Sequence, residues 1–217
     1  MKSKNKIRCF TAAGLIAAFA IWTLLIRTVD VRAIGPEGSE VGFAALNGAF
    51  HGLTGVHMWL YTLTDWLGLV PIAVAVGFGV LGLVQWIGRR SLFKVEYRLF
   101  VLGGFYLAVM AVFLLFEVFV VNYRPVLIEG VLEASYPSST TLLVMCIMPT
   151  ALVELCHRIK GRALKHGAAA LVTVFTAFMV VGRLLSGVHW VTDIIGGGLI
   201  SAGLVMSYLA VCGLKAE

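Results

Sequence analysis

The sequence predicts an all-α membrane protein, a polytopic bundle of six transmembrane helices with both termini inside. Of its 217 residues, 60% are hydrophobic and only 13% are charged, and the mean hydropathy is +0.96. That composition is too apolar for an ordinary soluble domain. Several apolar stretches also reach the roughly 20 residues that cross about 30 Å of hydrocarbon. The length suits one compact bundle, so we expect a single integral membrane domain over residues 1–217.

The apolar stretches define six spans, which are in chain order Phe10–Ile26, Asp65–Ile87, Leu99–Val121, Ser138–Cys156, Gly167–Leu185 and Trp190–Leu214. A cleaved signal peptide is the competing interpretation of the first span, which follows four basic residues. Since Val31-Arg32-Ala33 is a poor cleavage site, an uncleaved helix is favoured. Small residues let helices approach closely, so we expect tight packing at Gly77, Gly79 and Gly82 and at residues 196–198.

The distribution of positive charge sets the orientation of the spans. The formal net charge is +6, but 13 of the 17 Lys and Arg residues lie at the termini, between spans two and three, or between spans four and five. The positive-inside rule explains this asymmetry without any nucleic-acid partner. We therefore expect a multi-pass protein of the plasma membrane whose segments 27–64, 122–137 and 186–189 face outward. The four cysteines form no C-x-x-C pair, so neither a disulfide nor a metal site is expected.

The longest outward segment contains a short helical pattern. Phe43, Leu46 and Phe50 recur at helical spacing, which fits a helix lying in the membrane interface. Such a helix is either a lid or lipid guide, or a plain packing element. His51 and His57 in the same segment have no role that the sequence decides.

The most informative stretch runs from Gly182 to Asp193 and has the order R-x5-H-x3-D. If the sixth span begins near Gly187, His189 and Asp193 lie one helical turn apart on one face. The carboxylate can then accept a hydrogen bond from the Nδ1–H group and leave Nε2 free for attack. The alternative is an interfacial pair that extends to water beside an interfacial tryptophan.

Two arginines accompany this pair on the predicted outer side. Arg183 ends the fifth span, and Arg124 closes the third, where Pro125 breaks the helix. An ordinary juxtamembrane cation is the alternative for Arg124. The fourth span begins after Pro137 with Ser138, Ser139 and Thr140, a helix start that binds an anion or is simply N-capped. Together these groups describe a phosphoryl-transfer site.

Three ordered motifs resemble the type-2 phosphatidic acid phosphatase superfamily, which includes the vanadium-dependent haloperoxidases. They are Glu117-x6-Arg124-Pro125, Pro137-Ser-Ser-Thr140 and Gly182-Arg183-x5-His189-x3-Asp193, against the family patterns K-x6-R-P, P-S-G-H and S-R-x5-H-x3-D. The resemblance covers about residues 58–214, and its third motif is the most specific.

The resemblance implies a mechanism and a set of site residues. His189 would attack phosphorus to form a phosphohistidine that water later hydrolyses, and Asp193 would orient the imidazole. The groups that would hold the phosphate are Arg124, Arg183, Ser138 and the backbone amides of Ser139 and Thr140. The implied reaction needs no metal or other cofactor, and the implied partners are a phosphorylated lipid substrate and the membrane lipids.

Three positions depart from the family pattern. Position 117 is Glu instead of a phosphate-binding Lys, position 182 is Gly instead of Ser, and position 140 is Thr instead of the His that protonates the leaving group. A threonine hydroxyl cannot act as an acid near neutral pH. Glu117 either pairs with one of the arginines or donates a proton itself.

The sequence therefore favours a hydrolase, a membrane lipid phosphatase or diphosphatase on the outer face. Its substrate would be an isoprenyl pyrophosphate or a phosphatidate. The rival is a catalytically impaired family member that binds lipid phosphate or interacts with a protein partner, because Glu117 and Thr140 replace functional residues. Channels and transporters are disfavoured, since the ionisable residues gather at one edge rather than deep in several spans.

Overall fold

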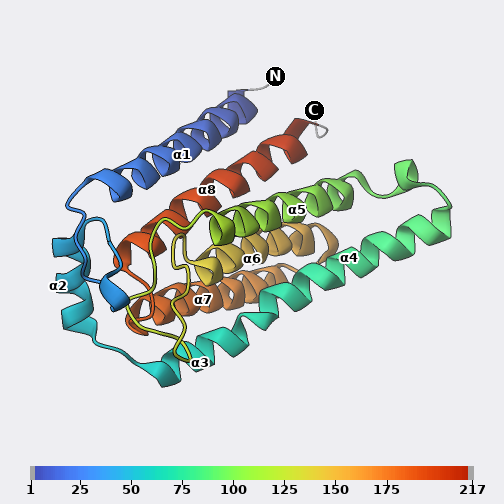
Figure 1. Cartoon of the computed structure of the whole chain (residues 1–217). Coiled ribbons are helices and arrows are strands. Elements are labelled where there is room, and N and C mark those ends of the chain that lie inside the picture. Colours follow the sequence, from blue (N-terminus) through green and yellow to red (C-terminus); the bar gives the residue numbers. More distant parts are fainter. Residues whose placement is uncertain (1–2, 215–217) are drawn as a thin grey trace.

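The computed structural model describes residues 3–214, which fold mainly into helices (Figure 1). The helices are α1 (Ser3–Thr28), η1 (Pro36–Gly38), α2 (Ala44–Thr54), α3 (Met58–Leu67), α4 (Leu69–Arg89), η2 (Leu92–Lys94), α5 (Tyr97–Val118), α6 (Ser139–Arg158), α7 (Arg162–Leu185) and α8 (Val191–Leu214). Six segments of this part are long and apolar enough to span a membrane, which confirms the all-α six-span fold.

The largest difference from the predicted spans is in the second. The apolar segment runs from Met58 to Arg89, so it joins α3 and α4 and begins before Asp65. The third span ends at Val118 rather than at Val121. Chain segments of similar apolarity continue beyond both points, which is why composition alone misplaces these ends.

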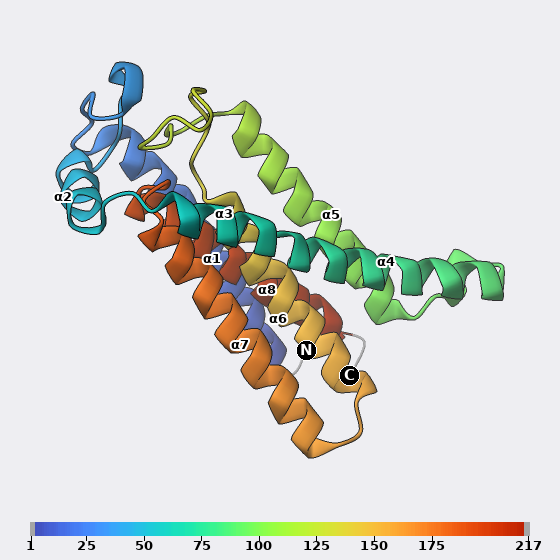
Figure 2. The ribbon, with the colours of Figure 1, turned by 90° about the horizontal axis from the view of Figure 1, so that it is seen from below.

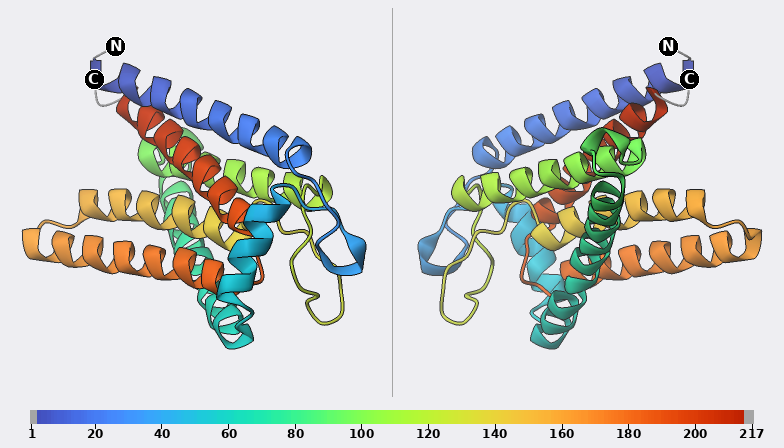
Figure 3. Two further views of the ribbon diagram at one scale, coloured as in Figure 1. Left: turned by 90° about the vertical axis from the view of Figure 1, so that its left-hand side faces the viewer. Right: turned by 90° about the vertical axis from the view of Figure 1, so that its right-hand side faces the viewer.

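Two helices form the centre of the bundle. Of the residues in the most apolar 18-residue stretch of each spanning segment, 56% are buried in α6 and 44% in α8, against 6–22% in the other segments. Helix α1 packs along α8, and α7 packs along α6 as an antiparallel neighbour (Figures 1 and 3). Helices α4 and α5 contact α6 from another side and diverge from the rest of the bundle (Figure 2). Most side chains of the peripheral helices therefore remain available to lipid.

The basic connections and the candidate-site segments lie at opposite ends of the bundle (Figure 1). The start of α1, the end of α8 and the α4–α5 and α6–α7 connections lie at one end (Figure 1). Helix α2, the loop after α5 and the α7–α8 connection lie at the other end, where the candidate site is found. The basic connections therefore lie opposite the site, as the charge pattern predicts.

A buried ion cluster ties three helices together at the basic end. Glu154 of α6 is fully buried and accepts hydrogen bonds from Arg98 Nε at 2.9 Å, Arg158 Nη1 at 3.0 Å and the Tyr208 hydroxyl at 2.6 Å. A buried carboxylate is tolerated only with such partners. The cluster fixes α5 and α8 against α6.

The helix expected in the long outward segment is present as α2. Asn47 on its inner face donates to Thr192 Oγ1 at 3.0 Å and to the Gly42 carbonyl at 2.8 Å, which fastens α2 to the start of α8. Leu53 on its outer face is 86% exposed. Helix α2 thus packs with one face and presents an apolar face outward.

Of the six glycines for which the sequence predicts tight packing, two are closely packed in the structure. A Cβ atom on Gly196 would overlap the Tyr136 ring, and one on Gly197 would lie 3.1 Å from Thr141. The remaining glycines expected to pack tightly, which are Gly77, Gly79, Gly82 and Gly198, have open space around the Cβ position. The expectation is wrong for these four. Gly196 and Gly197 thus allow the segment that leads into α6 to pack closely against α8.

Candidate functional site

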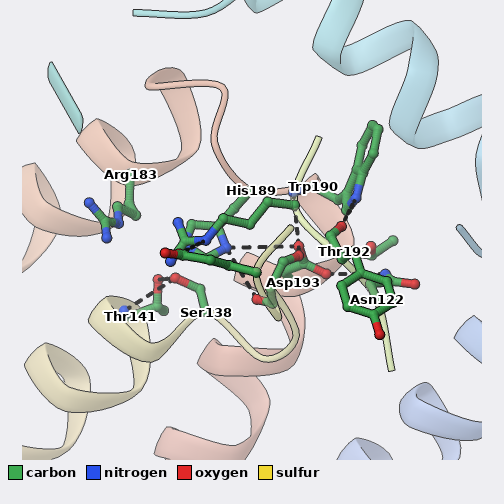
Figure 4. A network of polar contacts seen from close by, with 12 residues as sticks. Asn122, Ser138, Thr141, Arg183, His189, Trp190, Thr192 and Asp193 are labelled. Atoms are coloured by element: carbon green, nitrogen blue, oxygen red, sulfur yellow. Dashed lines mark hydrogen bonds and ion pairs between the residues drawn. The ribbon is translucent and has the colours of Figure 1, made fainter. Parts of the chain in front are cut away.

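The predicted site residues come from four segments that meet at one end of the bundle. His189 lies in the α7–α8 connection, Arg183 in the last turn of α7, and Arg124 in the loop after α5. Figure 4 shows His189 with Asp193 on one side and with Arg183 and the start of α6 on the other. Folding thus brings together residues that are up to 69 positions apart, Arg124 and Asp193.

His189 is held with one ring nitrogen fixed and the other available. Its Nδ1 lies 3.1 Å from the Ser135 carbonyl oxygen, which can only accept, so Nδ1 carries the hydrogen. Nε2 then holds the lone pair, and it lies 3.4 Å from Arg124 Nη1. Burial, followed by the charges of Arg124 and Arg183, lowers the pKa of His189 well below its usual 6.5. The ring is therefore neutral and nucleophilic at neutral pH.

Asp193 does not make the predicted hydrogen bond to His189. Its Oδ2 lies 3.9 Å from Nδ1, and the Ser135 carbonyl takes the Nδ1 hydrogen instead. The prediction is wrong because α8 begins at Val191, so His189 precedes the helix and the one-turn geometry does not apply. At this separation the carboxylate still favours positive charge on the imidazole.

Several donors fix the Asp193 carboxylate. It accepts hydrogen bonds from the Ser135 hydroxyl, from Asn122 Nδ2 at 3.2 Å and from the Trp190 backbone N–H at 2.9 Å. The last bond is the return arm of a capping box, since Asp193 lies in the first turn of α8 and Trp190 directly precedes it. Asp193 therefore joins the start of α8 to the loop after α5.

That loop is a hairpin-like excursion and not the end of a helix. Helix α5 ends at Val118, so the prediction that Arg124 closes the third span is wrong. The Arg124 N–H donates to the Glu133 carbonyl at 3.0 Å, and the Ser135 N–H donates to the Asn122 carbonyl at 2.9 Å. Arg124 Nε also pairs with Glu133 Oε2 at 3.0 Å. One hairpin thus presents Arg124 to Nε2 of His189 and the Ser135 carbonyl to Nδ1.

Arg183 is buried and held by α3. Its guanidinium donates to the Tyr61 carbonyl at 3.3 Å, to Thr64 Oγ1 at 3.2 Å and to Asp65 Oδ1 at 3.2 Å. It also lies over the Tyr61 ring, 4.7 Å from the centroid. With only 2% of the residue exposed, Arg183 has a fixed position from which to bind an anion.

The three predicted phosphate-binding residues at the start of α6 have two different positions, with Ser138 buried and Ser139 and Thr140 lining the cleft. Ser138 is fully buried, and its hydroxyl accepts hydrogen bonds from the Thr141 N–H at 3.4 Å and the Thr141 hydroxyl at 3.1 Å. Its side chain is therefore the N-cap of α6, the alternative that the sequence left open. Ser139 and Thr140 line the adjoining cleft instead, and their N–H groups have no acceptor within the helix.

The cleft beside these residues has a volume of about 250 Å³ and two kinds of wall. Its polar wall consists of Asp65, Arg124, Ser139, Thr140 and Arg183, and its apolar wall includes Leu69, Ile72, Phe113 and Leu143. A separate hollow of only about 10 Å³ lies next to His189 and is lined by Glu117, Ser135 and Ser139. The larger cleft therefore suits an anionic head group with an apolar chain.

Glu117 lines the small hollow beside His189, whereas the two outer histidines, His51 and His57, contact the connection between α7 and α8. Within residues 3–214, Glu117 forms neither of the ion pairs expected for it, and its carboxylate lines the small hollow. The His51 ring makes an edge contact with Trp190 at 5.6 Å between centroids. The His57 backbone N–H donates to the Ser186 carbonyl at 2.9 Å, while the residue itself is exposed. Both histidines therefore support the α7–α8 connection.

Sequence reasoning missed four residues that shape the site, namely Tyr61, Asp65, Asn122 and Ser135. Asp65 offered a signal, because an acidic residue inside an apolar segment is costly unless it has a function or a partner. The other three are common residue types in loops or at a membrane interface. Nothing in their spacing distinguishes them.

Comparison with known proteins agrees with the motifs and the fold. Residues 120–214 match the family model of the PAP2 superfamily, a region that includes Arg124, Arg183 and His189 but begins after Glu117. The structure is similar to the crystal structure of the first transmembrane PAP2 type phosphatidylglycerolphosphate phosphatase from Bacillus subtilis. The TM-score is 0.60 at 18% identity, over 95% of this chain and 97% of that one. The sequence matches no curated protein. The family match therefore covers the C-terminal part of this chain, and the structural similarity shows that the whole chain has the fold of that membrane protein.

Proposed function

We propose that this protein is a membrane lipid phosphatase or diphosphatase that works through a phosphohistidine intermediate. The observation that carries the proposal is the approach of Arg124 Nη1 to within 3.4 Å of His189 Nε2. Arg124 lines the same cleft as Arg183 and the start of α6. A phosphate bound by these three donors has its phosphorus next to the Nε2 lone pair.

The geometry supports the following first step. Nε2 of His189 attacks phosphorus while the bond to the leaving group breaks, and the leaving group keeps the electron pair. Nδ1 retains its hydrogen, so positive charge develops on the ring, where the Ser135 carbonyl at 3.1 Å and the Asp193 carboxylate at 3.9 Å stabilise it. Arg124, Arg183 and the N–H groups of the α6 start neutralise the phosphate oxygens.

The residue at position 140 favours a diphosphate substrate. Thr140 lines the cleft where the family pattern has a proton-donating His, and a threonine hydroxyl does not protonate an alkoxide near pH 7. In a lipid diphosphate the departing group is a lipid monophosphate, whose second pKa is about 6 and which leaves without protonation. The apolar wall of the cleft suits the lipid chain. We therefore favour an isoprenyl diphosphate over a phosphatidate.

The site is proposed to face outward from the plasma membrane. The basic α4–α5 and α6–α7 connections lie at the end of the bundle opposite the cleft, and positive connections remain in the cytoplasm. Accessibility of single cysteines placed at Gly130 and at Gly161 to a membrane-impermeant reagent in intact cells tests this orientation. We expect labelling at Gly130 and none at Gly161.

Phosphate release by purified protein tests the activity itself. The wild type should release phosphate from a short-chain isoprenyl diphosphate faster than from a phosphatidate, and His189→Ala should abolish both release and an acid-labile phosphoenzyme. Equal rates on the two lipids would contradict the substrate assignment. If the wild type binds both lipids without releasing phosphate, the protein is a lipid-phosphate-binding member of the family, the second candidate that Thr140 and Glu117 favour.

A further inference from the structure

The second half of the proposed reaction lacks an obvious base. Water must attack phosphorus in line with the breaking P–Nε2 bond, from the face opposite His189. The family pattern has its proton-transferring His at position 140, where this chain has Thr140. A group that accepts the proton of the attacking water must therefore come from another element that lines the cleft.

We infer that Asp65 is this base. Asp65 lines the same cleft as Arg124, Ser139, Thr140 and Arg183, a cleft that His189 does not line. Within residues 3–214 the only side chain that pairs with it is Arg183, through Oδ1 at 3.2 Å. Among the described residues the second oxygen, Oδ2, has no side-chain partner, and 58% of the side chain is exposed. This inference rests on the proposed phosphohistidine mechanism.

The step balances as follows. The oxygen of a water molecule in the cleft forms a bond to phosphorus, and the P–Nε2 bond breaks with its electron pair returning to His189. A proton of that water passes to Oδ2 of Asp65 and then to bulk solvent through the open side of the cleft. Arg183 pairs with Oδ1 of Asp65 at 3.2 Å, which leaves Oδ2 to take the proton.

Glu117 is the rival carboxylate, and its position disfavours it. It lines the small hollow that contains His189 itself, together with Ser135 and Ser139, and it does not line the larger cleft. Water in that hollow would approach from the nucleophile's own side, which is the wrong face for in-line attack.

The matched substitutions are Asp65→Asn and Thr64→Val. An asparagine keeps an oxygen that accepts from Arg183 but cannot take a proton. Valine at position 64 removes another acceptor of Arg183, at 3.2 Å, and leaves the carboxylate in place. The first change removes the base, and the second disturbs only the position of Arg183.

The experiment follows single and multiple turnovers of an isoprenyl diphosphate radiolabelled at its terminal phosphate. Asp65→Asn should keep the first burst of lipid monophosphate to within about threefold, accumulate acid-labile phosphohistidine and lower steady-state turnover about 10²-fold, the lower range for general base catalysis. Thr64→Val should slow the burst and the steady state equally, without accumulation. Glu117→Gln should also show no accumulation.

Two results overturn the inference. Equal loss of burst and steady state in Asp65→Asn with no phosphoenzyme would show that Asp65 only positions Arg183. Accumulation in Glu117→Gln instead would assign the base to the other carboxylate. Failure of the proposed function itself looks different, because the wild type and His189→Ala would then both lack a burst and any labelled protein.

Discussion

Replacement of Arg124 by Gln should lower kcat/KM about 10²-fold. Arg124 is 8% exposed, and its Nη1 lies 3.4 Å from His189 Nε2, so in the proposed mechanism its charge acts directly on the transferring phosphoryl group. A unit charge about 4 Å away contributes about 4 kcal/mol at an effective dielectric constant of about 20. Arg183 and the α6 start remain, and water partly replaces the lost donor. The net loss should be about 3 kcal/mol, in the range of removing one oxyanion donor.

The same substitution should change the pH dependence of kcat/KM. Burial lowers the pKa of His189 most, and the charge of Arg124 lowers it further. Without that charge the pKa rises, so His189 becomes protonated and inactive at a higher pH, and the acidic limb of the profile moves upward. Arg124→Lys keeps the charge but loses the two-pronged contact with phosphate, so its rate should fall while its acidic limb stays near the wild-type position.

A control variant separates the catalytic contact of Arg124 from its surface ion pair. Glu133→Gln breaks the 3.0 Å pair with Arg124 Nε, but the Glu133 side chain is 40% exposed, so kcat/KM should change less than about fivefold. The assay is phosphate release from an isoprenyl diphosphate in detergent micelles between pH 4.5 and pH 8. If Arg124→Gln loses less activity than Glu133→Gln, or keeps the wild-type acidic limb, Arg124 is not adjacent to the reacting phosphoryl group.

Three further outcomes follow from the packing and chemistry of the site. Gly196→Ala should lower the free energy of unfolding by about 1–3 kcal/mol, because its methyl group would overlap Tyr136. The control, Gly198→Ala, should be nearly neutral, since there is open space around that Cβ position. Thermal unfolding of both variants in detergent compares them, and equal effects would contradict this packing. The pKa of His189 is lowered in the folded state, so below about pH 6.5 the unfolded chain binds a proton that the folded chain does not. The free energy of unfolding should therefore decrease as the pH is lowered. His189→Gln should show a shallower fall in melting temperature between pH 7.5 and pH 5.5, and an unchanged slope would assign the effect to other groups. Thr140→His should raise turnover of a phosphatidate at least 10-fold by restoring an acid in the cleft; an unchanged rate in a folded variant would mean that leaving-group protonation does not limit the reaction.

The sequence predicted the spans and the identity of the main site residues because both depend on local signals. Apolar stretches of sufficient length can hardly be anything but spanning helices in a chain this poor in charge. The run from Arg183 to Asp193 is itself nearly contiguous, so its members cannot be far apart in any fold. The assignment of Arg124 to the site needed the motif order, and the hairpin that carries it was not foreseen.

The contacts that orient the site depend on residues distant in sequence. Asp193 is held by Ser135 and Asn122, which lie 58 and 71 positions away. The hairpin exists because residues on its two sides bond to each other, as Tyr123 and Ala134 do in a β-bridge. Neither pairing leaves a periodic trace in the sequence. The predicted His189–Asp193 bond failed for the same reason, since a carbonyl from the distant hairpin competes for the Nδ1 hydrogen.

Asp65 shows what an isolated charge in a span signifies. The sequence offered Glu117 as one possible partner of Arg183, but the carboxylate that pairs with it is Asp65, 118 positions away on α3. Before a phosphate binds, this pair offsets part of the cost of burying a guanidinium beside Arg124. When a phosphate occupies the cleft, the same carboxylate faces an anion, which weakens binding. Such a carboxylate is compatible with an efficient phosphatase if its negative charge serves a later step of the reaction. In-line attack by water on the phosphohistidine is such a step, because it requires a base on the side of phosphorus opposite His189.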